Sequence, residues 1–129
     1  MKFNTLIPEL TVSDINKSKD FYINVLQFKV EYERPENNFV FISREGNQLM
    51  LKQDNGHWRT GDLVYPYGRG VNFEMTVFDV ASLYHRVLQS GIRPFCELRE
   101  NHYQNNDERI SQNEFLIQDP DGYLVRFTD

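Results

Sequence analysis

The sequence contains a single cysteine, no cluster of basic residues and no long apolar run. One cysteine, Cys96, cannot form a disulfide within the chain, so a reducing cytoplasm is the expected compartment. The net charge of −5 argues against nucleic-acid binding, which usually needs a basic face. No apolar stretch approaches the ~20 residues that span a bilayer, and residues 1–14 contain no long apolar signal core. We therefore expect a soluble cytoplasmic protein with neither a nucleic-acid nor a membrane partner.

The length and an internal repeat together predict one domain built from two similar halves. A chain of 129 residues that is 40% hydrophobic and 14% aromatic can bury one core but is too short for two ordinary domains. The segments "LTVSDI" at 10–15 and "MTVFDV" at 75–80 lie 65 positions apart, about half the chain. We expect a single domain over 1–129, with modules at about 1–54 and 70–129 joined by a loop at 55–69.

Each half is predicted to contain a strand, a capped helix and three further strands. Ser13 or Asp14 can cap a first helix and Asp79 a second, because each precedes apolar residues at helical spacing. Gly91 is suited to end the second helix. The further strands are expected at 28–33, 39–44 and 48–53, and then at 92–98, 113–118 and 123–128. The polar stretch 99–113 between two of these strands is expected to be a surface loop, and a mobile lid is one interpretation of it.

Three segments carry a resemblance to a known superfamily. They are "IPELTVSDINKSKDFYINVLQFKVEYE" at 7–33, "GVNFEMTVFDVASLYHRVLQSGI" at 70–92 and "EFLIQDPDGYLVRF" at 114–127. They resemble the vicinal oxygen chelate superfamily, which includes glyoxalase I, ring-cleaving dioxygenases, fosfomycin-modifying enzymes and bleomycin resistance proteins. The resemblance implies an α+β fold in which two tandem βαβββ modules form an incomplete barrel around a cup, commonly completed in a homodimer. Pro8 matches the hinge proline of the bleomycin resistance branch, which implies an exchanged amino-terminal strand.

Metal enzymes of this superfamily place histidine or carboxylate side chains at four strand positions around the cup. The resemblance puts these positions on Ile7, Met50, Asn72 and Arg126, with Pro8 or Glu9 as the first position if the register slips. None of the four offers a histidine or a carboxylate, and the guanidinium of Arg126 would repel a divalent cation. We therefore expect no metal cofactor at these positions.

A different set of carboxylates leaves a second interpretation open. Glu9, Glu74 and Glu114 share strand parity with the expected cup positions, and three carboxylates can hold a hard cation. The chain would then be a glyoxalase- or dioxygenase-like metalloenzyme with displaced ligands. The simpler interpretation is that Glu74 or Glu114 pairs with Arg126, and the sequence does not decide between them.

An intact scaffold without metal ligands favours binding over catalysis. Within the superfamily this combination is typical of bleomycin resistance proteins, which sequester a drug in a homodimer without altering it. We expect a non-catalytic protein that binds a small molecule, such as a cationic drug, by aromatic stacking and acidic attraction. A third interpretation is a regulatory partner with a vestigial cup. The predicted ligand-binding residues are Phe39, Phe41, Met50, Trp58, Asn72, Glu74, Glu114 and Arg126, with Tyr65 and Tyr67 as further aromatic candidates.

Overall fold

The strands form two four-stranded sheets with the same internal order, as the repeat in the sequence predicts. The structure is a computed structural model that describes residues 2–129. The sheet orders are β1-β4-β3-β2 and β5-β8-β7-β6, and in each sheet the first two strands of this order run parallel. Within the described residues neither sheet closes into a barrel. The strands are β1 (Glu9–Val12), β2 (Lys29–Arg34), β3 (Phe39–Arg44), β4 (Asn47–Gln53), β5 (Asn72–Thr76), β6 (Cys96–Asn105), β7 (Glu108–Gln118) and β8 (Leu124–Thr128).

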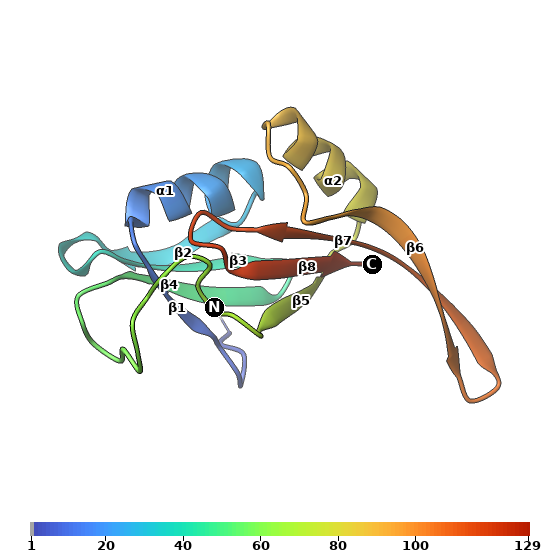
Figure 1. Cartoon of the computed structure of the whole chain (residues 1–129), viewed down its shortest axis with the longest axis horizontal. Helices are drawn as coiled ribbons and strands as arrows, with labels where there is room; N and C mark the ends of the chain where they lie inside the picture. Colours follow the sequence, from blue (N-terminus) through green and yellow to red (C-terminus); the bar gives the residue numbers. More distant parts are fainter. Residues whose placement is uncertain (1) are drawn as a thin grey trace.

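Both helical segments lie on the same side of the sheets (Figure 1). The first is α1 (Ile15–Lys19), which continues as a π-helical turn η1 (Asp20–Val25), and the second is α2 (Val80–Gln89). A single turn of 3-10 helix, η2 (Pro35–Asn37), separates β2 from β3. Among residues 2–129 no helix covers the opposite side of the sheets, which carries Phe41 and Arg126. We call it the open side.

The helix starts follow the capping signals in the sequence. Of the two candidate caps, Asp14 caps α1, since its carboxylate accepts a hydrogen bond from the backbone N–H of Asn16 at 3.0 Å. Asp79 caps α2 by accepting from the backbone N–H of Ser82 at 3.1 Å. Gly91 follows α2 with φ +80°, a left-handed conformation that suits glycine at a helix end. The capping predictions are therefore confirmed, and the choice left open at the first helix falls on Asp14.

Strand alternation sends one set of side chains toward the helices and the other toward the open side. On the helix side the two sheets and both helices share one buried apolar cluster, so the modules have a common core. Burial of these side chains provides the main driving force for folding, at roughly 25 cal/mol per Å² of apolar surface. The strand residues in this cluster include Val40, Ile42, Leu49, Leu51, Phe115, Ile117, Val125 and Phe127.

A buried carboxylate in the β7–β8 turn links the second module to the first. Asp119 accepts a hydrogen bond from the hydroxyl of Tyr22 at 2.8 Å, and also from the backbone N–H groups of Asp121 at 2.9 Å and Tyr123 at 3.0 Å. The hydroxyl of Tyr123 in turn donates to the backbone carbonyl of Thr11 at 2.8 Å. Burial raises the pKa of Asp119 from an ordinary 3.8 to about 6, although its hydrogen bonds act in the other direction. These hydrogen bonds therefore hold the β7–β8 turn of the second module against the first module.

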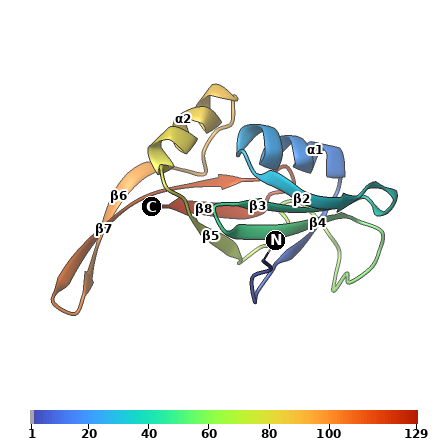
Figure 2. The same ribbon diagram turned by 180° about the vertical axis from the view of Figure 1, so that it is seen from behind.

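The prediction of a loop at 99–113 is wrong. This segment forms the outer part of a long hairpin between β6 and β7 that projects from the body as a two-stranded arm (Figures 1 and 2). Its tip is a two-residue turn in which Asn106 has φ +57°, and on the arm Tyr103 pairs with Ile110. The polar composition of this segment predicts a loop because both faces of the arm are exposed to solvent. Its strands therefore show no apolar alternation in the sequence.

The connection between the modules, residues 54–71, contains neither helix nor strand, as expected for a linking loop. None of the helices formed by residues 2–129 has the length and apolar character needed to cross a membrane.

Candidate functional site

An aromatic row runs across the open side of the first sheet. Phe41 on β3 pairs with Tyr32 on β2 and with Met50 on β4, and Met50 pairs with Glu9 on β1. These four positions point to the open side because the residues flanking Phe41 in β3 belong to the core on the helix side. The row therefore offers two rings and a polarizable thioether on one face, with a carboxylate at its end.

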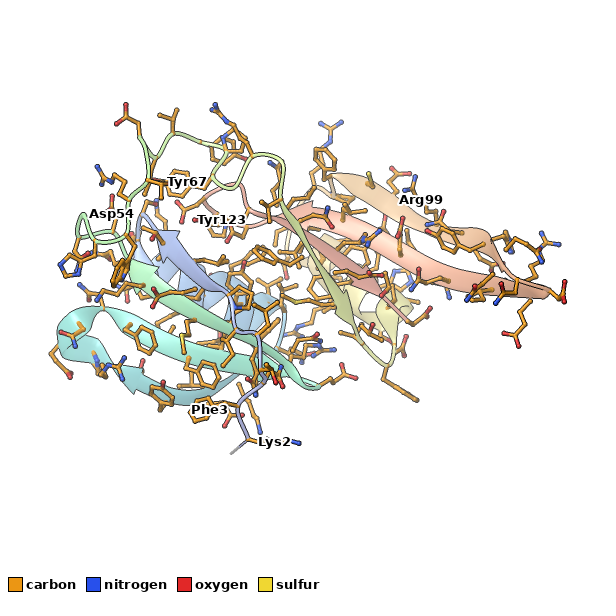
Figure 3. The ribbon with its side chains drawn as sticks, turned by 90° about the horizontal axis from the view of Figure 1, so that it is seen from below. Lys2, Phe3, Asp54, Tyr67, Arg99 and Tyr123 are labelled. Carbon is orange, nitrogen blue, oxygen red and sulfur yellow. The ribbon has the colours of Figure 1, made fainter. Side chains whose placement is uncertain are left out.

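The chain itself covers these rings. The ring of Phe3 lies with its centroid 5.5 Å from that of Phe41, and Tyr32 lies 5.3 Å away on the other strand, so Phe41 is 0% exposed. The guanidinium of Arg34 sits 4.3 Å from the ring centroid of Phe39, which is also buried. Figure 3 shows Phe3 on the open side, viewed from the face opposite the helices. Phe39 and Phe41, two of the aromatic residues predicted to contact a ligand, are therefore covered by side chains of the same chain.

An ionic chain of four side chains crosses the open side of the second sheet. Arg126 on β8 donates to the carboxylate of Glu74 on β5 at 2.9 Å, and its other terminal nitrogen lies 3.8 Å from the carboxylate of Glu114 on β7. Arg99 on β6 donates to Glu114 at 2.9 Å and 3.2 Å. The order across the strands is acid, base, acid, base. The chain therefore carries no net charge, and Arg126 is neutralised internally.

Three polar atoms in this region have no hydrogen-bond partner among residues 2–129. They are one carboxylate oxygen of Glu114, which is 2% exposed as a residue, the Nε of Arg126 and the hydroxyl of Thr128. Thr128 pairs with Glu114 in the sheet and Arg126 lies two positions before Thr128 on β8, so the three atoms belong to one patch. All three atoms are buried, so the patch holds an unsatisfied acceptor, an unsatisfied donor and an unsatisfied hydroxyl below the surface.

A groove of about 280 Å³ lies where the amino-terminal segment, the start of β4 and β5 meet. It is lined by the amino-terminal segment through Asn4, Leu6 and Pro8, by the start of β4, and by β5 with Asn72 and Glu74. Two of the predicted ligand-binding residues therefore line the same groove, and one of them, Glu74, also belongs to the ionic chain.

The sequence profile of the Glyoxalase/Bleomycin resistance protein/Dioxygenase superfamily matches residues 3–127. The chain belongs to this superfamily. A solved superfamily member from Vibrio splendidus 12B01 is 38% identical over 93% of this chain and 92% of that one, with a TM-score of 0.44. No curated protein matches the chain.

More distant solved structures of similar shape support the fold alone. The chain is similar to TioX from Micromonospora sp. ML1, with 17% identity, 98% coverage of both chains and a TM-score of 0.74. It is also similar to the virulence protein STM3117 from Salmonella typhimurium, with 21% identity, 99% and 98% coverage and a TM-score of 0.70.

The four positions expected for the metal ligands of the superfamily hold other chemistry here. Met50 lies in the aromatic row, Asn72 opens β5 in the groove, and Arg126 is the centre of the ionic chain, while Ile7 precedes β1. No group of three His, Cys, Asp or Glu side chains within the part of the chain described, residues 2–129, is arranged to hold a metal ion.

The displaced carboxylates also fail to meet as a ligand set. Glu74 and Glu114 face the open side, as their parity predicts, but Arg126 and Arg99 hold their carboxylates. Glu9 lies on β1 in the other sheet, beside Met50. Both acids pair with Arg126, but unequally. Glu74 accepts a hydrogen bond from it, whereas Glu114 makes only a longer ion pair.

The three loop aromatics divide into two exposed residues, Trp58 and Tyr65, and one packing residue, Tyr67. Trp58 is 85% exposed and borders a small cavity with Glu9 and Lys52 at the edge of the first sheet. Tyr67 instead packs edge to face on Tyr123, with centroids 5.8 Å apart (Figure 3). Trp58 remains a candidate contact, whereas the ring of Tyr67 serves the junction of the loop with the β7–β8 turn.

Four residues of the site were missed from the sequence. Tyr32 shares a face with Phe41, and the pairing of two predicted strands could have shown this. Arg34 lies outside the strand predicted at 28–33, and Arg99 lies in the loop predicted at 99–113. Phe3 gave no signal, because it precedes the first periodic segment.

Proposed function

We propose that the chain is a non-catalytic protein that binds and sequesters a small molecule on its open side. The observation that carries the proposal is the ionic chain, in which Arg126 occupies the last expected metal-ligand position and is itself bound by Glu74. A guanidinium at this position supports recognition by hydrogen bonding rather than coordination of a divalent ion.

The two rows indicate the chemistry of the ligand. A flat ring suits the aromatic row of Tyr32, Phe41 and Met50, since rings and thioethers pack well on aromatic faces. A polar group that both donates and accepts suits the pair Arg126 and Glu74, whose side chains are 32% and 42% exposed. The net charge of −5 favours a ligand with a cationic part. Drug-like molecules such as bleomycin combine these features.

A metalloenzyme with displaced carboxylate ligands is the alternative. It would require Glu74 and Glu114 to exchange their arginine partners for a metal ion and Glu9 to approach from the other sheet. The geometry supports this less well than it supports binding, because each of the two acids in the second sheet already has a charged partner.

We also propose that the chain acts as a homodimer. The amino-terminal segment leaves Leu6 81% exposed, and burial of this side chain against a second copy favours association. In this single chain β1 pairs with β4 of the same chain, and an exchanged dimer would make the same pairing between two chains. Sedimentation at several protein concentrations tests this, with a mass of two chains as the expected result.

Calorimetric titration tests the binding role. The panel is metal-free bleomycin and two flat cations, proflavine and ethidium, added to the purified full chain. At least one compound should bind, and Arg126→Ala should weaken its binding about tenfold or more, because a charged hydrogen bond contributes about 1.5–3 kcal/mol. Arg93→Ala is the matched control, since Arg93 is exposed outside the site and should leave the dissociation constant unchanged. An absence of heat across the panel would count against the proposal.

A further inference from the structure

The amino-terminal segment, residues 2–6, is fastened across the open side by one side chain of β4 and one backbone carbonyl. The amide of Gln48 accepts from the backbone N–H of Asn4 at 2.8 Å and donates to the carbonyl of Lys2 at 2.7 Å. The side chain of Asn4 donates to the carbonyl of Gly46 at 2.7 Å. We call this segment the strap.

The strap places one ring on the aromatic row. Phe3 packs at a tilt of 41° on Phe41, with centroids 5.5 Å apart, the spacing of a favourable aromatic pair. Phe41 is completely buried although it belongs to the open side, where no helix covers it. Its burial therefore depends on Phe3 on one side and on its sheet neighbours on the other.

The strap is held only at its edge. Phe3 is 52% exposed, and the three hydrogen bonds of the strap are all at the surface, where water can replace them. Phe3 lies outside the common core of the two modules. Release of the strap would therefore expose the aromatic row without disturbing the packing beneath the helices.

We propose that Phe3 occupies the ring-binding position of the site in the free protein, and that a flat ligand ring binds on Phe41 by displacing it. The inference rests on the proposed binding function and adds its regulation: the strap is a built-in competitor. Binding then requires the released state. The apparent dissociation constant equals the intrinsic one divided by the fraction of chains in which the strap is released.

Two variants release the strap by different means, and one control does not. Phe3→Ala removes the competing ring, and Gln48→Ala removes two of the three tethers while leaving both rings in place. Phe78→Ala is the matched control, because Phe78 is 91% exposed and lies outside both rows and the groove. The dissociation constants of metal-free bleomycin, proflavine and ethidium are measured by calorimetry on the full chain without an amino-terminal tag.

Phe3→Ala should tighten binding of the ring compound about threefold to tenfold, the range expected for one aromatic pair. Gln48→Ala should tighten it in the same direction, and Phe78→Ala should leave it unchanged. Equal or weaker binding by Phe3→Ala would overturn the strap alone, since the site would then bind without displacement or with Phe3 as a contact. If neither the wild type nor any variant binds a compound of the panel, both the proposed function and the strap are overturned.

Hydrogen exchange gives a second readout that a merely stabilising role of Phe3 would not produce. The Asn4 amide donates a hydrogen bond to Gln48 in the free chain, which should slow its exchange with solvent. A saturating amount of the compound that binds should increase its exchange rate, because the strap leaves the sheet. Unchanged or greater protection of Asn4 in the complex would overturn the displacement.

Discussion

Arg126 donates a hydrogen bond to Glu74 at 2.9 Å across the parallel strands β5 and β8, at a position where a metal enzyme of the superfamily would carry a ligand. The same guanidinium lies 3.8 Å from Glu114, which is buried and bound from its other side by Arg99. Positive charge at this position is therefore part of a neutral, alternating chain. The open side of the second sheet is organised for hydrogen bonding, whereas that of the first sheet is organised for ring packing.

The two acids of the ionic chain should differ in their effect on stability. Glu114→Gln should lower the free energy of unfolding by about 1–3 kcal/mol, because it weakens a buried charged hydrogen-bond partner of Arg99. Glu74→Gln should cost less than about 1 kcal/mol, since Glu74 is exposed and surface ion pairs contribute little. Urea unfolding of the two variants measures both, and equal losses would contradict the ranking.

The link between the modules depends on the hydroxyl of Tyr22. Tyr22→Phe should lower the free energy of unfolding by about 1–3 kcal/mol, because one oxygen of the buried Asp119 then loses its donor. Tyr84→Phe is the control: Tyr84 packs through its ring on Phe115, and its loss of a hydroxyl should cost less than about 0.5 kcal/mol. If the two variants unfold at the same urea concentration, the hydrogen bond of Tyr22 does not stabilise the junction.

Asp119 should make stability depend on pH in the direction opposite to a salt-bridged acid. Its pKa is about 6 in the folded chain and lower when unfolded, so the folded chain holds the proton more tightly. This contribution is fully present below about pH 3.8 and is lost as the pH rises through about 6. The unfolding free energy of wild type relative to Asp119→Asn should therefore fall between pH 4 and pH 7. A constant or rising difference would contradict the raised pKa.

The sequence predicted the fold well where the signals were local. Asp14 and Asp79 precede apolar residues at helical spacing, and both cap helices as expected. Glu74 and Arg126 face the same side of the sheet, as strand parity predicts, and the structure supplies their pairing across β5 and β8. These features depend on neighbours a few positions away.

The features that the sequence did not reveal depend on contacts made by residues without a periodic context. The contact of Phe3 with Phe41 joins positions far apart in the chain, and the arm has no buried face to produce an apolar alternation. Phe39 and Phe41 are predicted ligand contacts, and only the structure shows that Arg34 and Phe3 cover them.

The arm should be the least stable part of the second sheet. Residues 101–104 form hydrogen bonds only within a two-stranded ribbon in solvent, whereas Phe115 and Ile117 are buried in the core between neighbouring strands. Amides of the arm should exchange with an opening free energy below about 2 kcal/mol, and those of the core segment only on near-global unfolding. Equal protection in both segments would indicate that another surface covers the arm.

The central claim is that the open side binds a small molecule without a metal ion and leaves it unchanged. The most direct test is calorimetric titration of the full chain with metal-free bleomycin, proflavine and ethidium in the presence of EDTA, followed by mass spectrometry of the recovered compound. The account predicts heat of binding in EDTA and recovery of the compound with its original mass. Binding that appears only after a divalent metal is supplied, or recovery of a compound with a changed mass, would contradict it.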